Sequence, residues 1–196
     1  LVLYGLLGLV GFGLAHLLGL PPMFREKAGW RAWFWQPLVI GLALGVILVV
    51  LDRLFAFAGG TQGFSHPQFP LSILASGTAG IGEEILFRLF VLSLWAWLAD
   101  LVLRRWQARN AALWIGNVVA ALAFAAAHLP AAMGLGGVSD PLQLPPLVLV
   151  ELFLLNGIIG LVCGQRSWKN GLVAAIGIHF WADIVWHVVW PLIGLG

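Results

Sequence analysis

The sequence predicts an all-α fold, a polytopic bundle of about six transmembrane helices in one integral-membrane domain over residues 1–196. Of these residues 61% are hydrophobic and only 9% are charged, and the mean hydropathy is +0.99. A soluble domain carries roughly 25% charged residues, so this class is excluded. The apolar runs are long and lack the alternation, about ten residues per strand, of membrane β-barrels. The lipid bilayer is therefore the first partner that we expect.

Each expected span is an apolar run bounded by prolines, glycines or basic residues. A run of about 20 apolar residues is long enough to cross a membrane as a helix. The first run has no basic start and no small-residue cleavage site, so we expect a membrane helix and not a signal peptide. Because the chain begins with Leu, we also expect further segments before it. The six runs are Leu1–Leu20, Pro37–Phe57, Leu71–Leu98, Ala111–Leu129, Leu147–Gly164 and Gly171–Leu192.

The basic residues are distributed asymmetrically along the chain. Of the ten Lys and Arg residues, eight lie in the loops after spans one, three and five. Basic loops face the cytoplasm, so the N-terminus of this segment is predicted to lie outside. This distribution explains the pI of about 9.2 without a nucleic-acid partner. The Ala-, Leu-, Gly- and Trp-rich composition favours the bacterial cytoplasmic membrane.

Three charged residues interrupt the third span. Glu83, Glu84 and Arg88 lie in a run that is otherwise apolar or small. Each such charge costs roughly 2.5–3.5 kcal/mol at the centre of a membrane, so all three need partners inside the protein. Glu84 and Arg88 are four residues apart and can pair on one helix face. Glu83 lies about 100° around the helix, so it is predicted to be the carboxylate that is free for chemistry.

Two later spans carry further polar groups at similar depth. His128 precedes Pro130, which interrupts the fourth span, and His179 and Asp183 share one face of the sixth. Helical rise places Glu83 and Asp183 each about 18 Å into its span, near the middle of the membrane. Lipid offers no polar partner, so these helices are predicted to converge on one site.

A carboxylate and two imidazoles around a cavity support two routes to hydrolysis of an acyl bond. In the first, Glu83, His128, His179 and Asp183 hold one divalent metal, and zinc suits this donor set. In the second, Glu83 is a general base on water, a histidine polarises it, and His179 with Asp183 stabilises the oxyanion. Spacing does not separate the routes. The His-Glu-x-x-His motif of soluble metalloproteases is absent from the sequence.

Three short motifs, in order and each in its own span, resemble those of the CAAX protease and bacteriocin-processing (CPBP) family of intramembrane endopeptidases. The similar region is about 71–192. The motifs are Glu83-Glu84-x-x-x-Arg88, Phe124-x-x-x-His128 and His179-x-x-x-Asp183.

The resemblance implies a role for each motif residue. Glu83 would activate the attacking water and His128 would assist it, while Glu84 and Arg88 would hold the site. His179 and Asp183 would stabilise the oxyanion or take part in metal binding. The substrate would be a peptide or a membrane-associated or lipid-anchored protein.

The last motif departs from the family pattern. Asp183 stands where members that process prenylated proteins have Asn. An ionised Asp cannot donate a hydrogen bond to an oxyanion. This favours Asp183 as a charge partner of His179 or as a metal ligand.

Three other functions are compatible with parts of the sequence. Ser76 lies in a segment that partly resembles the Gly-x-Ser-Gly turn of rhomboid serine proteases, although the first Gly is missing. A proton-coupled transporter also uses buried Glu, Arg and His residues, but usually shows internal repeats, and none is visible here. The third alternative is a non-catalytic membrane scaffold or immunity protein.

The remaining polar residues are expected to have structural or interfacial roles. Asp52 and Arg53 are predicted to pair locally, and His66 to lie on the surface. His187 is one turn beyond Asp183 on the same face and is predicted either to be interfacial or to contribute to the site. Glu151 is predicted either to be functional or to pair with an arginine or a backbone group.

Two features of the fifth span, an asparagine and a pair of glycines, are expected to serve helix packing. Asn156 is predicted to hydrogen-bond between helices. Gly160-x-x-x-Gly164 is a pattern typical of close helix packing.

Overall fold

The computed structural model describes residues 2–25, 29–59 and 66–193, and over these residues it is helical without strands. Five helices are long and apolar enough to cross a membrane, and a shorter apolar helix precedes them. This confirms the prediction of a polytopic bundle of about six spans. The α-helices are α1 (Val2–Leu17), α2 (Gln36–Gly59), α3 (Leu71–Glu84), α4 (Ser93–Leu103), α5 (Arg109–Ala126), α6 (Leu129–Gly136), α7 (Pro146–Asn170), α8 (Leu172–Asp183) and α9 (Trp190–Leu192).

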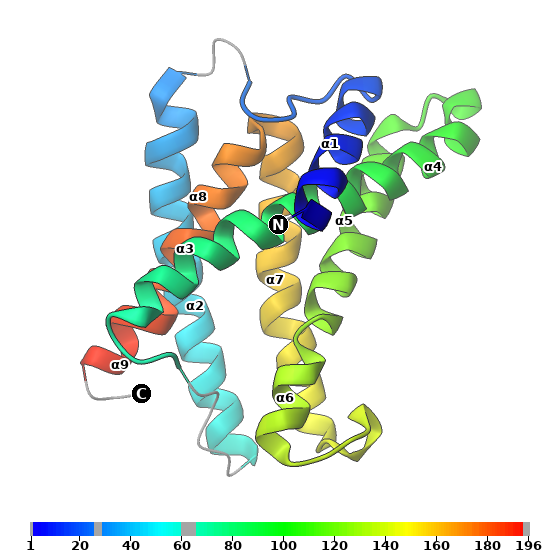
Figure 1. Ribbon diagram of the computed structural model, residues 1–196. Helices are drawn as coiled ribbons and strands as arrows, with labels where there is room; N and C mark the ends of the chain where they lie inside the picture. The colour runs from blue at the N-terminus through cyan, green and yellow to red at the C-terminus, as the bar shows by residue number, and fades with distance from the viewer. Residues whose placement is uncertain (1, 26–28, 60–65, 194–196) are drawn as a thin grey trace.

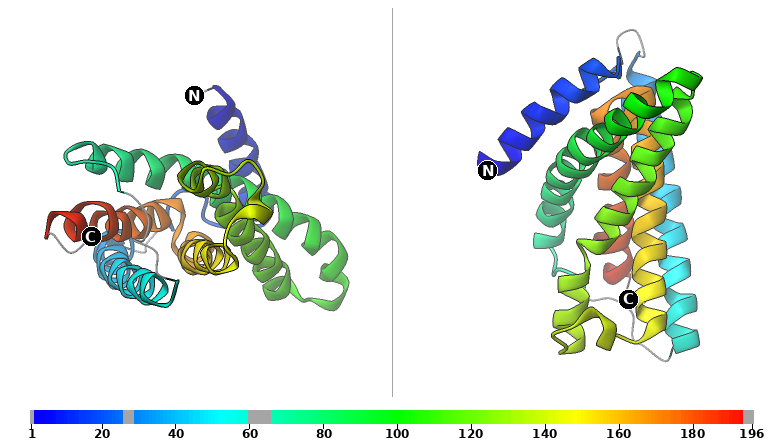
Figure 2. Two further views of the ribbon diagram at one scale, coloured as in Figure 1. Left: turned by 90° about the horizontal axis from the view of Figure 1, so that it is seen from below. Right: turned by 90° about the vertical axis from the view of Figure 1, so that its right-hand side faces the viewer.

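The bundle is built around α8, which packs between α2 and α7 and is crossed by α3 (Figures 1 and 2). Glycines on α2 permit the closest of these approaches. A Cβ on Gly41 would lie 2.6 Å from the Ile178 carbonyl oxygen, and one on Gly45 would lie 2.8 Å from that of Ala182. A methyl group at either position would clash with the backbone of α8. Glycine therefore allows the backbones of α2 and α8 to approach closely.

The first helix is shorter than predicted. It has 16 residues and ends at Leu17, so it extends only about 24 Å against a membrane core of about 30 Å. The chain leaves the helix before Leu20, with Gly19 at φ 61°. Figure 1 shows α1 alongside the junction of α3 and α4, where Gly11 lies against the backbone of Leu89.

The three basic segments meet at one end of the bundle, which we call the basic end. Backbone N–H groups of Arg25 and Leu172 donate to Asn170 and Pro22, at 3.0 and 3.3 Å, and the Arg109 guanidinium donates to the Leu18 carbonyl. These contacts join the segments that follow spans one, three and five. Lys27, one of the predicted basic residues, lies outside the described residues.

The segment with Arg166 and Lys169 is not the loop that we predicted. Helix α7 continues through both residues to Asn170, and Gly171, at φ 98°, turns the chain directly into α8. Only glycine adopts this backbone conformation without strain. The basic residues therefore mark the last turns of a helix that is longer than its apolar run.

Two π-helical segments continue α3 and α8 without a break. They cover Ile85–Leu92 and Ile184–Val189, and begin directly after Glu84 and Asp183. The third span is consequently one helix of 36 residues, Leu71–Trp106, longer than predicted. Wider π turns occur frequently at functional sites, and these two follow motif residues, whereas a third, Arg31–Trp35, precedes α2 and does not.

The predicted interruption near Pro130 is confirmed. Helix α5 ends at Ala126 and α6 begins at Leu129, with His128 between them. The close-packing pattern in α7 is confirmed as well. A Cβ on Gly160 would lie 2.8 Å from the Cβ of Ala121, so α5 and α7 are in direct contact.

Candidate active site

His179 lies at the centre of the polar groups from α3 and α8. Its Nδ1 is 2.8 Å from Glu84 Oε1, and its Nε2 is 3.7 Å from Glu83 Oε2 and 3.7 Å from Asp183 Oδ2. The helices that carry these residues converge as predicted. One imidazole therefore contacts three carboxylates, two of them through the same nitrogen.

The predicted pair of Glu84 and Arg88 is present behind His179. Arg88 Nε lies 3.2 Å from Glu84 Oε2, and neither side chain is exposed. The guanidinium also lies 4.4 Å from the ring centroid of Phe124, a cation–π contact. Glu84 thus has an arginine on one oxygen and an imidazole on the other, which gives it a structural role.

This arrangement fixes the orientation of His179. A carboxylate paired with arginine only accepts hydrogen bonds, so His179 Nδ1 donates to Glu84. The other ring nitrogen, Nε2, faces Glu83 and Asp183, and it donates toward them when the ring is protonated. Carboxylates commonly orient catalytic and metal-binding histidines in this way.

His128 reaches the same place from the break between α5 and α6. Its Nδ1 lies 2.9 Å from the Phe124 carbonyl oxygen, which can only accept, so Nδ1 is the donor. Its ring lies 4.8 Å from that of Phe124, and the Phe124 ring lies 5.6 Å from that of His179. Phe124 therefore separates the two imidazoles, and His128 Nε2 is the nitrogen left for chemistry.

A cavity of about 280 Å³ adjoins these groups. Its wall is largely apolar, with residues from α2, α6 and α7, and the side chain of Glu83 is 30% exposed. Glu84 and Arg88 are absent from the lining among the described residues, in keeping with their position behind His179. The polar residues of the lining are Glu83, His128, Asn156, His179, Asp183 and His187.

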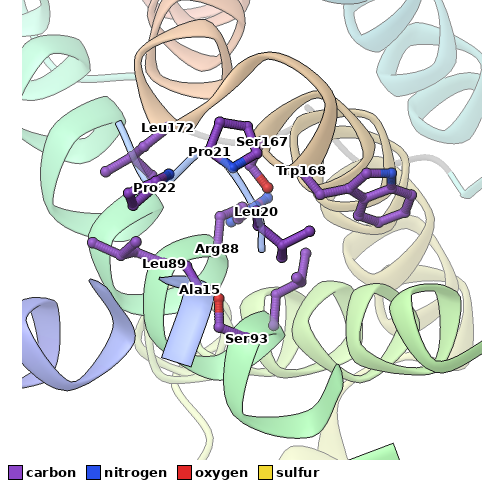
Figure 3. Close-up of a pocket in the computed structure, with 11 residues that line it drawn as sticks. Ala15, Leu20, Pro21, Pro22, Arg88, Leu89, Ser93, Ser167, Trp168 and Leu172 are labelled. Carbon is purple, nitrogen blue, oxygen red and sulfur yellow. The ribbon is translucent and has the colours of Figure 1, made fainter. Parts of the chain in front are cut away.

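A second, much smaller hollow lies toward the basic end (Figure 3). It measures about 10 Å³, roughly the room for one water molecule, and Arg88 is its charged lining residue. Figure 3 shows Arg88 among Leu20, Leu89 and Ser93. This hollow has no acid–base pair and does not compete with the larger cavity as a site.

The predicted metal ligands do not form a coordination sphere in this structure. Across the described ranges, no group of three or more His, Cys, Asp or Glu side chains is arranged to hold a metal ion. We therefore derive no step through a metal, and the zinc expectation stays a prediction.

One histidine was misplaced by sequence reasoning. His66, predicted to lie on the surface, is half-buried, and its Nδ1 lies 3.1 Å from Nδ1 of His187. His187, for which both an interfacial position and a site role were considered, lines the cavity. Asn156 also differs from expectation, because it donates to Leu152 of its own helix at 2.8 Å and not to a neighbouring helix.

A separate polar cluster lies nearer the other end of α2, away from the basic end. We call Asp52, Arg53 and Glu151 the distal cluster. Arg53 Nη2 lies 2.6 Å from Asp52 Oδ2, which confirms the predicted local pair. Glu151 is 3% exposed and lies within side-chain hydrogen-bonding reach of Asp52.

Fold and site together define a class: a polytopic helical membrane protein with a buried carboxylate–histidine site beside a cavity. A family model, "Rce1-like: Type II CAAX prenyl endopeptidase Rce1-like", matches residues 65–185. The chain belongs to this family, as the resemblance of its three motifs to CPBP proteases predicted. No curated protein and no solved structure matches it.

Proposed function

We propose that this protein is an intramembrane endopeptidase in which Glu83 activates the attacking water. The observation that carries the proposal is the position of Glu83: its carboxylate is partly exposed to the 280 Å³ cavity and lies 3.7 Å from His179 Nε2. Glu84 and Arg88 occupy the buried side of the same imidazole. Glu83, on the cavity side of His179, is placed to act as a general base, and Glu84, on the buried side, holds the imidazole in position.

In this mechanism a water molecule between Glu83 and the substrate carbonyl loses its proton to Glu83. The oxygen–carbon bond forms, and the carbon–nitrogen bond breaks when that proton reaches the leaving amine. The Nε2 atoms of His128 and His179 hold the attacking water and the tetrahedral intermediate in place. Asp183, 3.7 Å from His179 Nε2, acts as the charge partner of that imidazole.

The substrate that we propose is a membrane-associated or lipid-anchored peptide or protein. The cavity wall includes Leu135 of α6 and Leu152 and Ile159 of α7, so an apolar segment can be buried beside the scissile bond. The family description names prenyl endopeptidases, which is consistent with a substrate that carries a lipid.

We further propose the bacterial cytoplasmic membrane and an orientation with the basic end in the cytoplasm. Arg25, Arg109 and Lys169 lie in the three segments that meet there. The N-terminal end of α1 is then directed toward the outside.

Two observations disfavour the alternatives. Ser76, the nucleophile of a serine-protease mechanism, is fully buried and donates to the Ser72 carbonyl at 2.8 Å. It does not line the cavity. A scaffold needs no cavity-facing carboxylate beside a histidine held by a second carboxylate, and the internal repeats usual in transporters are not visible in the sequence.

The test is Glu83→Gln, which removes the base with little change in shape. Reconstituted wild-type protein and the variant are each incubated with membrane proteins from the host, and fragments are identified by mass spectrometry. We expect defined fragments whose rate of formation falls 10²–10⁴-fold in the variant. The control is Glu151→Gln, which removes a buried carboxylate outside the cavity.

Fragments that persist in Glu83→Gln would contradict the mechanism, and a wild-type protein without products would favour a transporter or scaffold. A chelator arm decides the metal. Loss of cleavage in chelator that zinc restores would establish the metal-assisted route, whereas unchanged cleavage supports water activation by Glu83 alone.

A further inference from the structure

His66 and His187 form a pair of imidazoles at the cavity. Their Nδ1 atoms are 3.1 Å apart and their ring centroids 5.2 Å apart, although the residues are 121 positions apart in sequence. His66 also lies against Trp186, at 5.2 Å between centroids. His187 lines the cavity and lies beyond the region 65–185 that the family model matches. No motif assigns a role to either residue.

The cavity has many hydrogen-bond acceptors and few donors. Glu83 and Asp183 are carboxylates, and His179 Nε2 already faces both of them at 3.7 Å. The Nδ1 atoms of His128 and His179 donate elsewhere. Asn156 has one N–H left after its bond to Leu152. Peptide hydrolysis needs donors at the carbonyl oxygen, where negative charge develops. An ionised Asp183 adds to the shortage because it can only accept hydrogen bonds.

The His66–His187 contact couples the tautomers of the two rings. A hydrogen bond between two Nδ1 atoms requires one donor and one acceptor. Burial lowers the pKa of His66; Asp52 opposes this effect and Arg53 adds to it. Neutral His66 that donates from Nδ1 leaves His187 with its proton on Nε2, the nitrogen not used by the pair.

We propose that His187 is a further catalytic residue whose Nε2–H donates to the substrate oxyanion, and that His66 is the positioning residue that fixes this tautomer. The proposal rests on the proposed peptidase function. No additional proton is transferred: Glu83 carries the proton from water to the leaving amine, and the His187 N–H donates a hydrogen bond throughout. His187 thereby supplies the donor that Asp183 does not.

Two nearly isosteric variants of His66 test the assignment. His66→Asn keeps an N–H donor near the position of Nδ1, whereas His66→Asp offers only an acceptor and forces the His187 proton onto Nδ1. We expect kcat to fall about 10²-fold in His66→Asp and to stay within about threefold in His66→Asn, with KM little changed in both. His187→Gln, which keeps an N–H, should retain more activity than His187→Leu.

Nitrogen NMR of ¹⁵N-histidine-labelled protein provides a readout that does not depend on cleavage. We expect the Nε2–H tautomer of His187 in the wild type and in His66→Asn, and the Nδ1–H tautomer in His66→Asp. An Nδ1–H tautomer in the wild type would overturn the proposal, as would equal kcat in the two His66 variants. A wild-type protein with the expected tautomer but no cleavage would show that the peptidase function had failed, and the catalytic role of His187 with it.

Discussion

Two polar clusters of similar composition can be compared among the described residues, and of these two the first adjoins the cavity. In the first, Glu84 pairs with Arg88 at 3.2 Å, and the guanidinium lies 4.4 Å from the Phe124 ring. In the distal cluster, Asp52 pairs with Arg53 at 2.6 Å, and the guanidinium lies 5.8 Å from a tryptophan ring, that of Trp190. Each cluster thus has an acid–arginine pair beside an aromatic ring, and the distal cluster has a second acid, Glu151.

The clusters differ in what they support. Glu84 also binds His179, which faces the cavity and Glu83, whereas no member of the distal cluster lines the cavity. The Arg88 side chain is unexposed, but that of Arg53 is 36% exposed. A charged pair within a membrane-spanning helix therefore indicates, by itself, only a local polar contact. It indicates chemistry only when it orients a group that faces a cavity.

The largest difference is expected between Glu84→Gln and Glu151→Gln. Glu84→Gln leaves Arg88 buried without a counter-charge, which typically costs 3–5 kcal/mol, and replaces the acceptor that orients His179. We expect cleavage to fall at least 10²-fold and the thermal midpoint in detergent to fall. Glu151→Gln replaces one of two adjacent acids by an amide that can donate to Asp52, so cleavage should stay within about twofold.

Equal losses of activity in these two variants would contradict the conclusion that the two clusters differ in function, because the distal cluster would then also affect cleavage. Arg88→Met in the Glu84→Gln background is the control for the origin of the effect. It removes the unpaired charge, so stability should recover in part while cleavage stays low.

The aromatic partners give a second, smaller contrast. Phe124 contacts Arg88, His128 and His179 at once, whereas Trp190 contacts Arg53. We expect Phe124→Leu to reduce cleavage about tenfold by freeing both imidazoles, and Trp190→Leu to change cleavage less than threefold. Both should lower the thermal midpoint, since each removes buried ring surface and a cation–π contact. If cleavage fell in proportion to the thermal midpoint in both variants, a positioning role for Phe124 would be contradicted.

Residues spaced four apart within a span were the part of the site that sequence could predict. The pairs Glu84 with Arg88 and His179 with Asp183 follow from helical geometry alone, and the cost of charge in lipid predicts that the helices meet. The fold class and the basic end followed from composition and the positions of basic residues.

The features that sequence could not predict depend on packing between distant segments. His66 lies outside any periodic pattern, and its partner His187 is 121 residues away. The π segments Ile85–Leu92 and Ile184–Val189 have no composition that separates them from ordinary apolar helix. The assembly of the cavity from α2, α3, α5, α6, α7 and α8 likewise arises only in three dimensions.

The smallest effect is expected for Ser76→Ala, a buried polar group on the same face of α3 as Glu84. Ser76 is unexposed, donates to the Ser72 carbonyl at 2.8 Å, and forms no ion pair or hydrogen bond with either cluster of described residues. Alanine removes the hydroxyl together with its need for a partner and leaves the helical backbone bonds intact, so stability should change by less than about 1 kcal/mol. Cleavage should stay within twofold in a side-by-side assay with Glu83→Gln. A loss comparable to that of Glu83→Gln would instead identify Ser76 as the nucleophile, and chemistry would then have to be assigned to a residue that does not face the cavity.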